Sequence, residues 1–354
     1  MQITRAEVIP VELKLRQPVH MANLPAISHV TAVFVRIETR QGESAWGCSV
    51  AHPDLTGDRP EDVLRACQEC ASIIPGMHPT NIEYSLSELA RLVPDAPTAL
   101  CAFDLALHDL LGFASGLPLY RLLGGYRDRI QTSVTIPISP THETVETAIA
   151  RARLGFRILK IKGGLDPEED VHRVRAVRRA LPELSLRLDA DGGYSVKQAL
   201  DVARALKDHL EMLEQPTPAA DLQGLGQVTQ NSPVPILADQ SAAGPASVLK
   251  LASQHIVNGV SVKLATCGGF RCARQVDSIA RAAHMATMVS CVIEPALLIS
   301  AGLSLALSSP NVRYGDLDGY LDLVNDPSIV GFKLVDGWLV ASETSGLGGS
   351  LDLG

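Results

Sequence analysis

Ionisable residues recur along the second half of the chain at almost equal intervals. Each one ends a short apolar run and follows the previous one by 24 to 27 residues. The five positions are Lys162, Asp189, Glu214, Asp239 and Lys263. An interval of that length is typical of one strand–helix unit. Because the carboxyl ends of the parallel strands in a (β/α) barrel share one face, we expect these side chains to converge there on a single site.

The three carboxylates in this series lie on successive units and would act as hard oxygen ligands. Neither histidine nor cysteine is among them, so the pattern favours Mg²⁺ over Zn²⁺. Lys162 precedes the carboxylates along the chain, and Lys263 follows them. Around a closed barrel the two lysines would lie on opposite sides of the metal. A substrate carboxylate bound to that metal would therefore have its α-carbon between two amines.

Lys160 adds a third amine, two residues before Lys162 and on the same face of the strand. An ordinary lysine has a pKa of about 10.4 and is a poor base at neutral pH. The neighbouring ammonium and the metal should lower the pKa of Lys162, because like charge disfavours the protonated form. The metal would also stabilise the enediolate that is left when the α-proton departs. These residues predict proton abstraction next to a carboxylate.

Such a site needs a scaffold of repeated strands and helices, and the sequence after the linker LPLYRLLGGYRDR has that pattern. Short β-branched runs alternate with helical stretches, which is typical of a parallel sheet. The expected strands cover residues 132–137, 157–161, 185–188, 210–213, 234–238, 259–264, 287–290 and 312–314, and helices cover 141–154, 168–180, 195–207 and 270–284. About eight strands in about 190 residues favour a (β/α) barrel over an open sheet. No GxGxxG motif follows the first strand, which disfavours a dinucleotide-binding fold.

The first part of the chain has the pattern of an α+β unit of roughly 125 residues, a normal domain size. Strands are expected at residues 2–15, 30–39 and 44–50, and helices at 60–74, 81–92 and 98–115. A CxxC pair, Cys67 and Cys70, falls in the first of these helices. The chain has seven cysteines and no second CxxC, which predicts two ordinary thiols rather than a redox or zinc site.

The composition of the 354 residues excludes several classes of function. Hydrophobic residues make up 46% and charged residues 20%, so a large core is available and global disorder is excluded. The net charge of −8 offers no general electrostatic footprint for nucleic acid or an anionic membrane. No signal peptide is visible, and the most apolar stretch, residues 296–307, is too short to span a bilayer. We therefore expect a soluble cytoplasmic protein with no nucleic-acid or membrane partner.

Motifs along the chain resemble those of the enolase superfamily, in its muconate-lactonizing-enzyme subgroup. The matching segments are ALCAFDLALHDLLGFASGLPLYRLLGG, LKIKGG, LDADGG, LEQP, ADQS and VKLATCGG, and the resemblance extends over essentially the whole chain. It implies an α/β fold with an α+β capping domain at residues 1–127 and a modified TIM barrel, (β/α)7β, at residues 128–325. Residues 326–354 would return to the capping domain. It also implies Mg²⁺ held by Asp189, Glu214 and Asp239.

The end of the last expected strand distinguishes the reactions within this subgroup. The sequence DLDG at residues 316–319 resembles the dipeptide epimerases, in which both aspartates bind the ammonium group of the substrate. In an extended segment Asp316 and Asp318 point the same way, and two carboxylates can neutralise one ammonium. Thr135, on the first barrel strand, resembles a position that contacts the substrate in these enzymes.

Further candidates lie around the expected site. Ser290 and Glu294 follow the seventh strand and would line the pocket, and a pocket-facing Glu294 would favour a cationic substrate side chain. The loops at residues 19–25 and 48–57 come from the capping domain, which in this family closes over the site. Asp54, in the second loop, is another candidate specificity carboxylate.

Two residues depart from the family pattern. The position after the third ligand usually holds Glu and here holds Gln240, which removes a charge near Lys263. The first-ligand motif usually reads Asp-x-Asn, and here its second member is Asp191. The extra carboxylate would tighten metal binding or lie in the layer around the ligands. Neither change deletes a ligand or a base.

The primary hypothesis is a Mg²⁺-dependent isomerase that epimerises L,L-dipeptides at the C-terminal residue. One of Lys162 and Lys263 would remove the α-proton, the other would return it to the opposite face, and Lys160 would help to stabilise the enediolate. Alternatives in the same barrel are an N-acylamino acid racemase, an o-succinylbenzoate synthase and a muconate-type cycloisomerase. A non-catalytic metal-binding protein is the alternative from a different class, although binding alone does not need two bases. Closed homo-oligomers are the default expectation for assembly.

Overall fold

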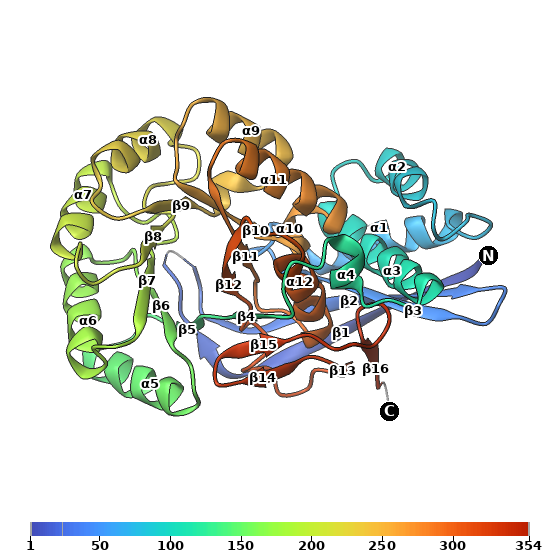
Figure 1. Ribbon diagram of the computed structural model, residues 1–354, viewed down its shortest axis with the longest axis horizontal. Coiled ribbons are helices and arrows are strands. Elements are labelled where there is room, and N and C mark those ends of the chain that lie inside the picture. Colours follow the sequence, from blue (N-terminus) through green and yellow to red (C-terminus); the bar gives the residue numbers. More distant parts are fainter. Residues whose placement is uncertain (1, 23, 353–354) are drawn as a thin grey trace.

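The computed structural model describes residues 2–22 and 24–352, and its first unit is an antiparallel sheet covered by helices (Figure 1). The strands β1 (Ile3–Val19), β2 (Ile27–Thr39) and β3 (Ser44–Ala51) pair in that order. The helices are α1 (Pro60–Ile73), α2 (Ile82–Leu92) and α3 (Pro97–Ser115). Aliphatic side chains of β2 and of the three helices form a core with Phe103 of α3. Strands β1 and β2 extend further than the sequence predicts, because their ends continue the hairpin toward the barrel.

Helix α3 is apolar on nearly all sides. By length and composition alone it satisfies the requirement for a membrane span, but most of it is buried within the fold. It packs against both β3 and α10 (Leu264–Cys267). Gly47 of β3 permits this close approach, since a Cβ there would lie 1.9 Å from the carbonyl oxygen of Ala102. The composition of α3 therefore reflects its place between the sheet and the barrel.

The second unit is a parallel barrel whose strands pair in sequence order from β5 to β12. The strands are β5 (Val134–Ile136), β6 (Ile158–Lys162), β7 (Ser185–Asp189), β8 (Met212–Glu214), β9 (Ile236–Ala238), β10 (Gly259–Lys263), β11 (Ala286–Ser290) and β12 (Val312–Asp316). The outer helices are α5 (Thr141–Arg153), α6 (Pro167–Ala180), α7 (Val196–Ala205), α8 (Leu222–Asn231), α9 (Pro245–Ser253), α11 (Phe270–Ala282) and α12 (Ala296–Ser308). A parallel bridge between Thr132 and Gly315 joins the two ends of the sheet. The predicted fold, an α+β capping unit with a (β/α)7β barrel, is confirmed.

Several elements are absent from the sequence prediction. Helix α12 is buried along its whole length, so its sequence has no polar face to reveal a helical period. The other unpredicted helices are α4 (Leu119–Leu123), α8, α9 and α10. The unpredicted strands are β4 (Arg129–Gln131), β13 (Ser328–Val330), β14 (Lys333–Val335), β15 (Trp338–Val340) and β16 (Gly349–Leu351). These strands have three residues each, too few for a period-two pattern.

The segment after the barrel is joined to earlier parts of the chain. Strand β15 pairs with β4 and β14, and β13 pairs with β16. The buried Asp109 carboxylate of α3 accepts hydrogen bonds from the backbone N–H of Leu347 at 2.7 Å and of Trp46 at 3.2 Å. Burial raises the pKa of Asp109 to about 7, although these two hydrogen bonds lower it. We propose that the chain has three parts: a capping domain at residues 1–127, a barrel at residues 128–325 and a returning segment at residues 326–354.

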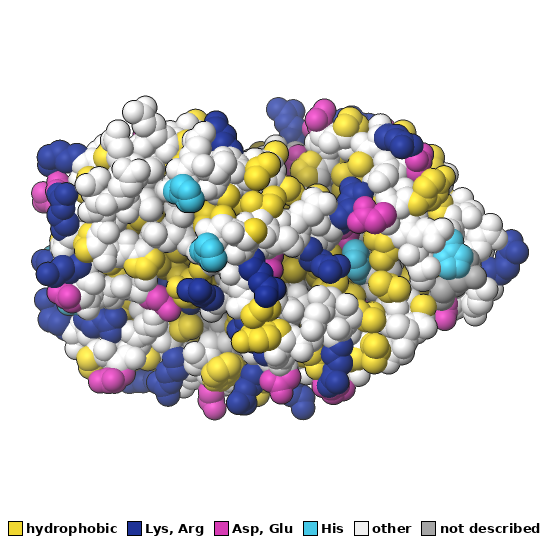
Figure 2. All heavy atoms as spheres, turned by 45° about the horizontal axis from the view of Figure 1, so that its top comes forward, with side chains coloured by type: hydrophobic (Ala, Val, Ile, Leu, Met, Phe, Trp, Pro, Cys, Tyr) yellow, Lys and Arg dark blue, Asp and Glu magenta, His cyan; other side chains and the backbone are white. Residues whose placement is uncertain are grey.

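The surface mixes charges of both signs. On the face shown in Figure 2, basic and acidic side chains are interspersed and lie mostly near the margins. Hydrophobic side chains are exposed nearer the middle of the same face. This mixed distribution differs from the continuous basic stripe that is typical of a nucleic-acid-binding face.

Candidate active site

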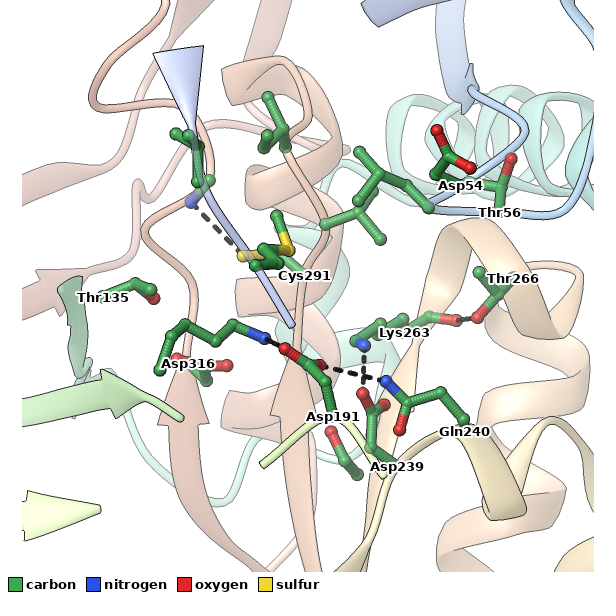
Figure 3. Close-up of a pocket in the computed structure, with 18 of the residues that line it drawn as sticks. Asp54, Thr56, Thr135, Asp191, Asp239, Gln240, Lys263, Thr266, Cys291 and Asp316 are labelled. Atoms are coloured by element: carbon green, nitrogen blue, oxygen red, sulfur yellow. Dashed lines mark hydrogen bonds and ion pairs between the residues drawn. The ribbon is translucent and has the colours of Figure 1, made fainter. Parts of the chain in front are cut away.

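The register of the barrel sheet aligns the ionisable strand ends with one another. Lys162 of β6 lies opposite Asp189 of β7, and Asp189 lies opposite Glu214 of β8. On the other side of the barrel, Lys263 of β10 lies opposite Ser290, which lies opposite Asp316. A cavity of about 330 Å³ opens over these ends. The residues predicted from spacing alone therefore meet at one end of the barrel, as Figure 3 shows for Asp239, Lys263 and Asp316.

Lys160 is the centre of an ion-pair network. Its Nζ lies 2.8 Å from Asp316 Oδ2, 2.9 Å from Asp189 Oδ2 and 2.9 Å from Glu214 Oε2. Burial lowers the pKa of this ammonium, but Asp189 and Asp316 raise it further, so the pKa lies well above its usual value. Lys160 is thus a fixed cation beneath the cavity.

Lys162 and Lys263 approach the cavity from opposite sides of the barrel, each with a carboxylate partner. Lys162 Nζ lies 2.8 Å from Asp189 Oδ2 and 2.9 Å from both oxygens of Asp191, and Lys263 Nζ lies 2.6 Å from Asp239 Oδ2. Burial lowers the pKa of each lysine, but these carboxylates outweigh it and raise both values. Lys160 lowers the pKa of Lys162, as expected, but by less than Asp189 and Asp191 raise it. The further lowering expected from a bound metal stays a prediction.

The three predicted metal ligands are buried carboxylates with unequal surroundings. All three lie within 2.9 Å of a lysine Nζ, but among the described residues neither oxygen of the fully buried Glu214 has a well-aligned hydrogen bond. Burial, and then the charge of Asp189, raise the pKa of Glu214 to about 8. In the part of the chain that the structure describes, no three His, Cys, Asp or Glu side chains already stand at ligand geometry, and Lys160 lies between two of these carboxylates. Three buried carboxylates, of which Glu214 lacks an aligned hydrogen-bond donor, fit a hard divalent cation.

The two aspartates of the DLDG segment both line the cavity but have different partners. Asp316 is bound to Lys160 and accepts hydrogen bonds from the hydroxyls of Ser133 and Ser290. In the described part of the chain, Asp318 accepts the backbone N–H of Thr135 at 2.6 Å and a long contact from the Cys291 thiol, with no lysine partner. Burial and the charge of Asp316 raise the pKa of Asp318 to about 6. Asp318 is therefore the more available carboxylate for a cationic group.

Ser290 and Glu294 lie beside the cavity and do not line it. The Ser290 hydroxyl donates to Asp316 Oδ2 at 2.7 Å and supports that carboxylate from below. Glu294 is 3% exposed, and its carboxylate accepts the backbone N–H of Val292. Burial raises the pKa of Glu294 to about 8. The idea that Glu294 selects a cationic substrate is therefore wrong. The turn after β11 directs its side chain inward.

The capping unit supplies one wall of the cavity. Asp54, a candidate whose direction the sequence left open, lines it together with Leu55 and Thr56 of the same loop and with residues at the end of β1. Ser133 is a functional candidate that the sequence analysis missed. Its position two residues before Thr135, on the same strand face, was the available signal. The side chain of Thr135 lines the cavity as expected.

The two departures from the family pattern are in contact with each other. The Gln240 amide donates to Asp191 Oδ1 at 3.2 Å (Figure 3). Asp191 also binds Lys162. Asp191 has a left-handed φ of 45°, and its backbone N–H donates to Asp189 Oδ1. An amide therefore faces a carboxylate across this contact, and the carboxylate lies on the side of Lys162.

Two family models match the chain and together cover most of it. The model "Enolase C-terminal domain-like" matches residues 143–353. The model "Mandelate racemase / muconate lactonizing enzyme, N-terminal domain" matches residues 3–124.

Relatives with named activities match over nearly the whole length of both chains. A hydrophobic dipeptide epimerase of Enterococcus faecalis is 33% identical over 98% of this chain and 99% of its own. A dipeptide epimerase structure from that organism, complexed with Mg and L-Leu-L-Tyr, is also 33% identical, with a TM-score of 0.96 over 99% of this chain and 100% of that one. A dipeptide epimerase structure from Methylococcus capsulatus, complexed with Mg and L-Arg-D-Lys, is 34% identical, with a TM-score of 0.94 over 99% of each chain. A substrate-liganded L-Ala-D/L-Glu epimerase from Bacillus subtilis is 30% identical, with a TM-score of 0.96 over 100% of each chain. Epimerases are isomerases, and the chain belongs to the mandelate racemase and muconate lactonizing enzyme group of the enolase superfamily.

Proposed function

We propose that this protein is a Mg²⁺-dependent dipeptide epimerase that inverts the α-carbon of the C-terminal residue. The observation that carries the proposal is the placement of two lysines, Lys162 on β6 and Lys263 on β10, on opposite sides of one cavity that also contains Asp318. The named activities of the relatives point to the same reaction.

Asp189, Glu214 and Asp239 would hold the Mg²⁺, since their buried oxygens are hard ligands in need of a cation. When bound, the ion would stabilise the negative charge that develops on the substrate carboxylate and would compete with the lysines for the same carboxylate oxygens. Lys160 would remain a fixed cation beside that developing charge, because Asp316 holds its ammonium at 2.8 Å.

The two remaining lysines would divide the proton transfer between them. One lysine, as the neutral amine, takes the α-proton from its side of the substrate. The other, as the ammonium, gives a proton to the opposite face, so the configuration inverts. The ion pairs of Lys162 with Asp191 and of Lys263 with Asp239 would fix the directions of the two Nζ atoms.

Asp318 would bind the N-terminal ammonium of the dipeptide, with Asp316 adding its charge from behind. The Thr135 N–H holds one oxygen of Asp318, and the residue lines the cavity. A carboxylate pair in this position attracts a cation, repels a second carboxylate and gains no ion pair from a neutral N-acyl group. That preference is the reason for placing dipeptides ahead of N-acyl amino acids.

The test is incubation with a mixed L,L-dipeptide library in D₂O with Mg²⁺, read by mass spectrometry for a gain of one dalton. Label at the α-carbon of a subset of dipeptides supports the proposal. Lys162→Ala and Lys263→Ala should each abolish epimerisation, while Lys250→Ala, on the outer helix α9, should not. Near-normal turnover in either active-site variant would contradict the two-base scheme. Label that enters only N-acyl amino acids would replace the dipeptide assignment by an N-acylamino acid racemase.

A further inference from the structure

The upper part of the cavity has apolar walls from both units of the fold. Leu15 and Val19 at the end of β1, together with Leu55 after β3, line it from the capping unit. Val292 and Ile293, after β11, line it from the barrel. These walls can bury the methylene groups of a long substrate side chain, which is favourable because apolar surface leaves water.

The lower part of the cavity has its cations already paired. The three lysines in its lining lie within 2.9 Å of carboxylate oxygens. No arginine is among the cavity-lining residues in the described ranges 2–22 and 24–352. Asp322, which also lines the cavity, is bound to Arg151 at 2.7 Å. An acidic substrate side chain would therefore enter a cavity with no available cation.

Asp54 is different from the other lining carboxylates because its side chain has no ion pair or hydrogen bond within the described residues. Only its backbone N–H is bound, to His52 Nδ1 at 3.2 Å. Burial lowers the pKa of His52 despite the nearby Asp54, so the imidazole is neutral at pH 7 and does not cancel the charge. The rim of the cavity therefore carries one uncompensated negative charge next to Leu55.

The position of Asp54 indicates which part of a substrate it would meet. In Figure 3, Asp54 and Thr56 lie on the Lys263 and Thr266 side of the cavity, and Asp316 and Thr135 lie on the other side. The ammonium end of a dipeptide would lie near Asp316 and its α-carbon between the lysines. A side chain that reaches Asp54 would then belong to the C-terminal residue.

We propose that the C-terminal residue of the preferred dipeptide is Lys or Arg, and that Asp54 is the specificity-determining residue that binds its cation. This inference rests on the proposed dipeptide epimerase function. The aliphatic stem of the side chain lies along the apolar walls, and its charged head reaches the rim. Norleucine has the same stem without the charge, and glutamate has the opposite charge, so these two residues isolate the role of Asp54.

The experiment is a competition in D₂O with Mg²⁺ among L-Ala-L-Lys, L-Ala-L-Arg, L-Ala-L-norleucine and L-Ala-L-Glu, with label measured for each. The wild-type protein should label the Lys and Arg dipeptides first and the Glu dipeptide last. Asp54→Asn should lower kcat/KM for the cationic dipeptides about fivefold, the effect of one partly exposed ion pair, and change norleucine less than twofold. Asp95→Asn, which removes an exposed carboxylate of the same unit outside the cavity, is the matched control.

Three outcomes would overturn the inference. If norleucine or Glu leads in the wild-type protein, the cavity does not select a cation. If Asp54→Asn leaves kcat/KM for the cationic dipeptides unchanged, or if Asp95→Asn lowers it as much, Asp54 is not the selecting residue. Both results leave the proposed dipeptide epimerase intact, because label still enters dipeptides. If no dipeptide gains label, the proposed function fails and this inference fails with it.

Discussion

Without metal at pH 7, the wild-type protein should have a lower free energy of unfolding than a variant in which an uncharged residue replaces Glu214. Burial and Asp189 raise the pKa of Glu214 from an ordinary value of 4.5 to about 8. The folded protein therefore holds a proton that the unfolded chain releases, so the stability linked to this group is complete below pH 4.5 and is lost as the pH rises toward about 8. Between pH 4.5 and pH 7 the loss corresponds to about 3 kcal/mol. Glu214→Gln removes this loss, so the variant should be more stable than the wild type in EDTA at pH 7, by up to that amount.

Mg²⁺ should make the wild-type protein the more stable of the two. An ion that binds only the folded state adds about 2.7 kcal/mol when its concentration is 100 times its Kd, and the variant has lost one of the three oxygen ligands. Urea unfolding in EDTA and in Mg²⁺, followed by circular dichroism, measures both effects, with Glu146→Gln on the outer helix α5 as the control. A Glu214→Gln variant that is less stable than the wild type in EDTA would refute the account of the buried carboxylate. Equal stabilisation of both proteins by Mg²⁺ would refute the assignment of Glu214 as a ligand.

Three shorter predictions concern the junction of the two units and the cavity. Gly269→Ala should lower the free energy of unfolding by about 1 to 3 kcal/mol, since its φ is 91° and a Cβ would lie 2.6 Å from a side chain of α3. Gly57→Ala, with a φ of 81° and open space around it, should cost less in the same urea titration. For a dipeptide substrate, kcat/KM should fall as the pH drops through about 6, because Asp318 becomes protonated and no longer attracts the ammonium; a flat profile would contradict this role. Asp191→Asn and Gln240→Glu should each lower kcat, and the double variant, which exchanges the amide and the carboxylate across one contact, should recover activity if the contact positions Lys162.

The barrel and the meeting of its charged residues were predictable from the sequence because both follow from a repeated interval. A unit of about 25 residues returns the chain to the same end of the barrel, so Lys162, Asp189 and Glu214 had to be neighbours. Helix α12 was not predictable in this way, since a helix buried on every side has no polar face. The strands after residue 325 have three residues each, and they form through pairings with partners as distant as β4.

The pKa shifts and ion pairs of the site were less predictable than the identity of the residues that form it. The sequence indicates that Lys160 and Lys162 share a strand face, but not that Asp189 and Asp191 both lie within 2.9 Å of Lys162 and together raise its pKa. Glu294 was also misjudged, because the direction of a side chain after a strand end depends on the turn that follows. The contact between Asp191 and Gln240 joins residues that are 49 positions apart, so no local pattern reports it.

The hydrogen bonds of Asp109 set an order for the biosynthesis of this protein. Trp46 and Asp109 are translated long before Leu347, which is 238 positions after Asp109 in the chain. Until that last segment emerges, the carboxylate in α3 lacks one of its two backbone donors, and β4 lacks its partner β15. Domains usually fold in the order in which they are translated, at about 5–20 residues per second. Here the first unit to be translated can be completed only by the last, so the nascent chain has to wait many seconds with that surface open.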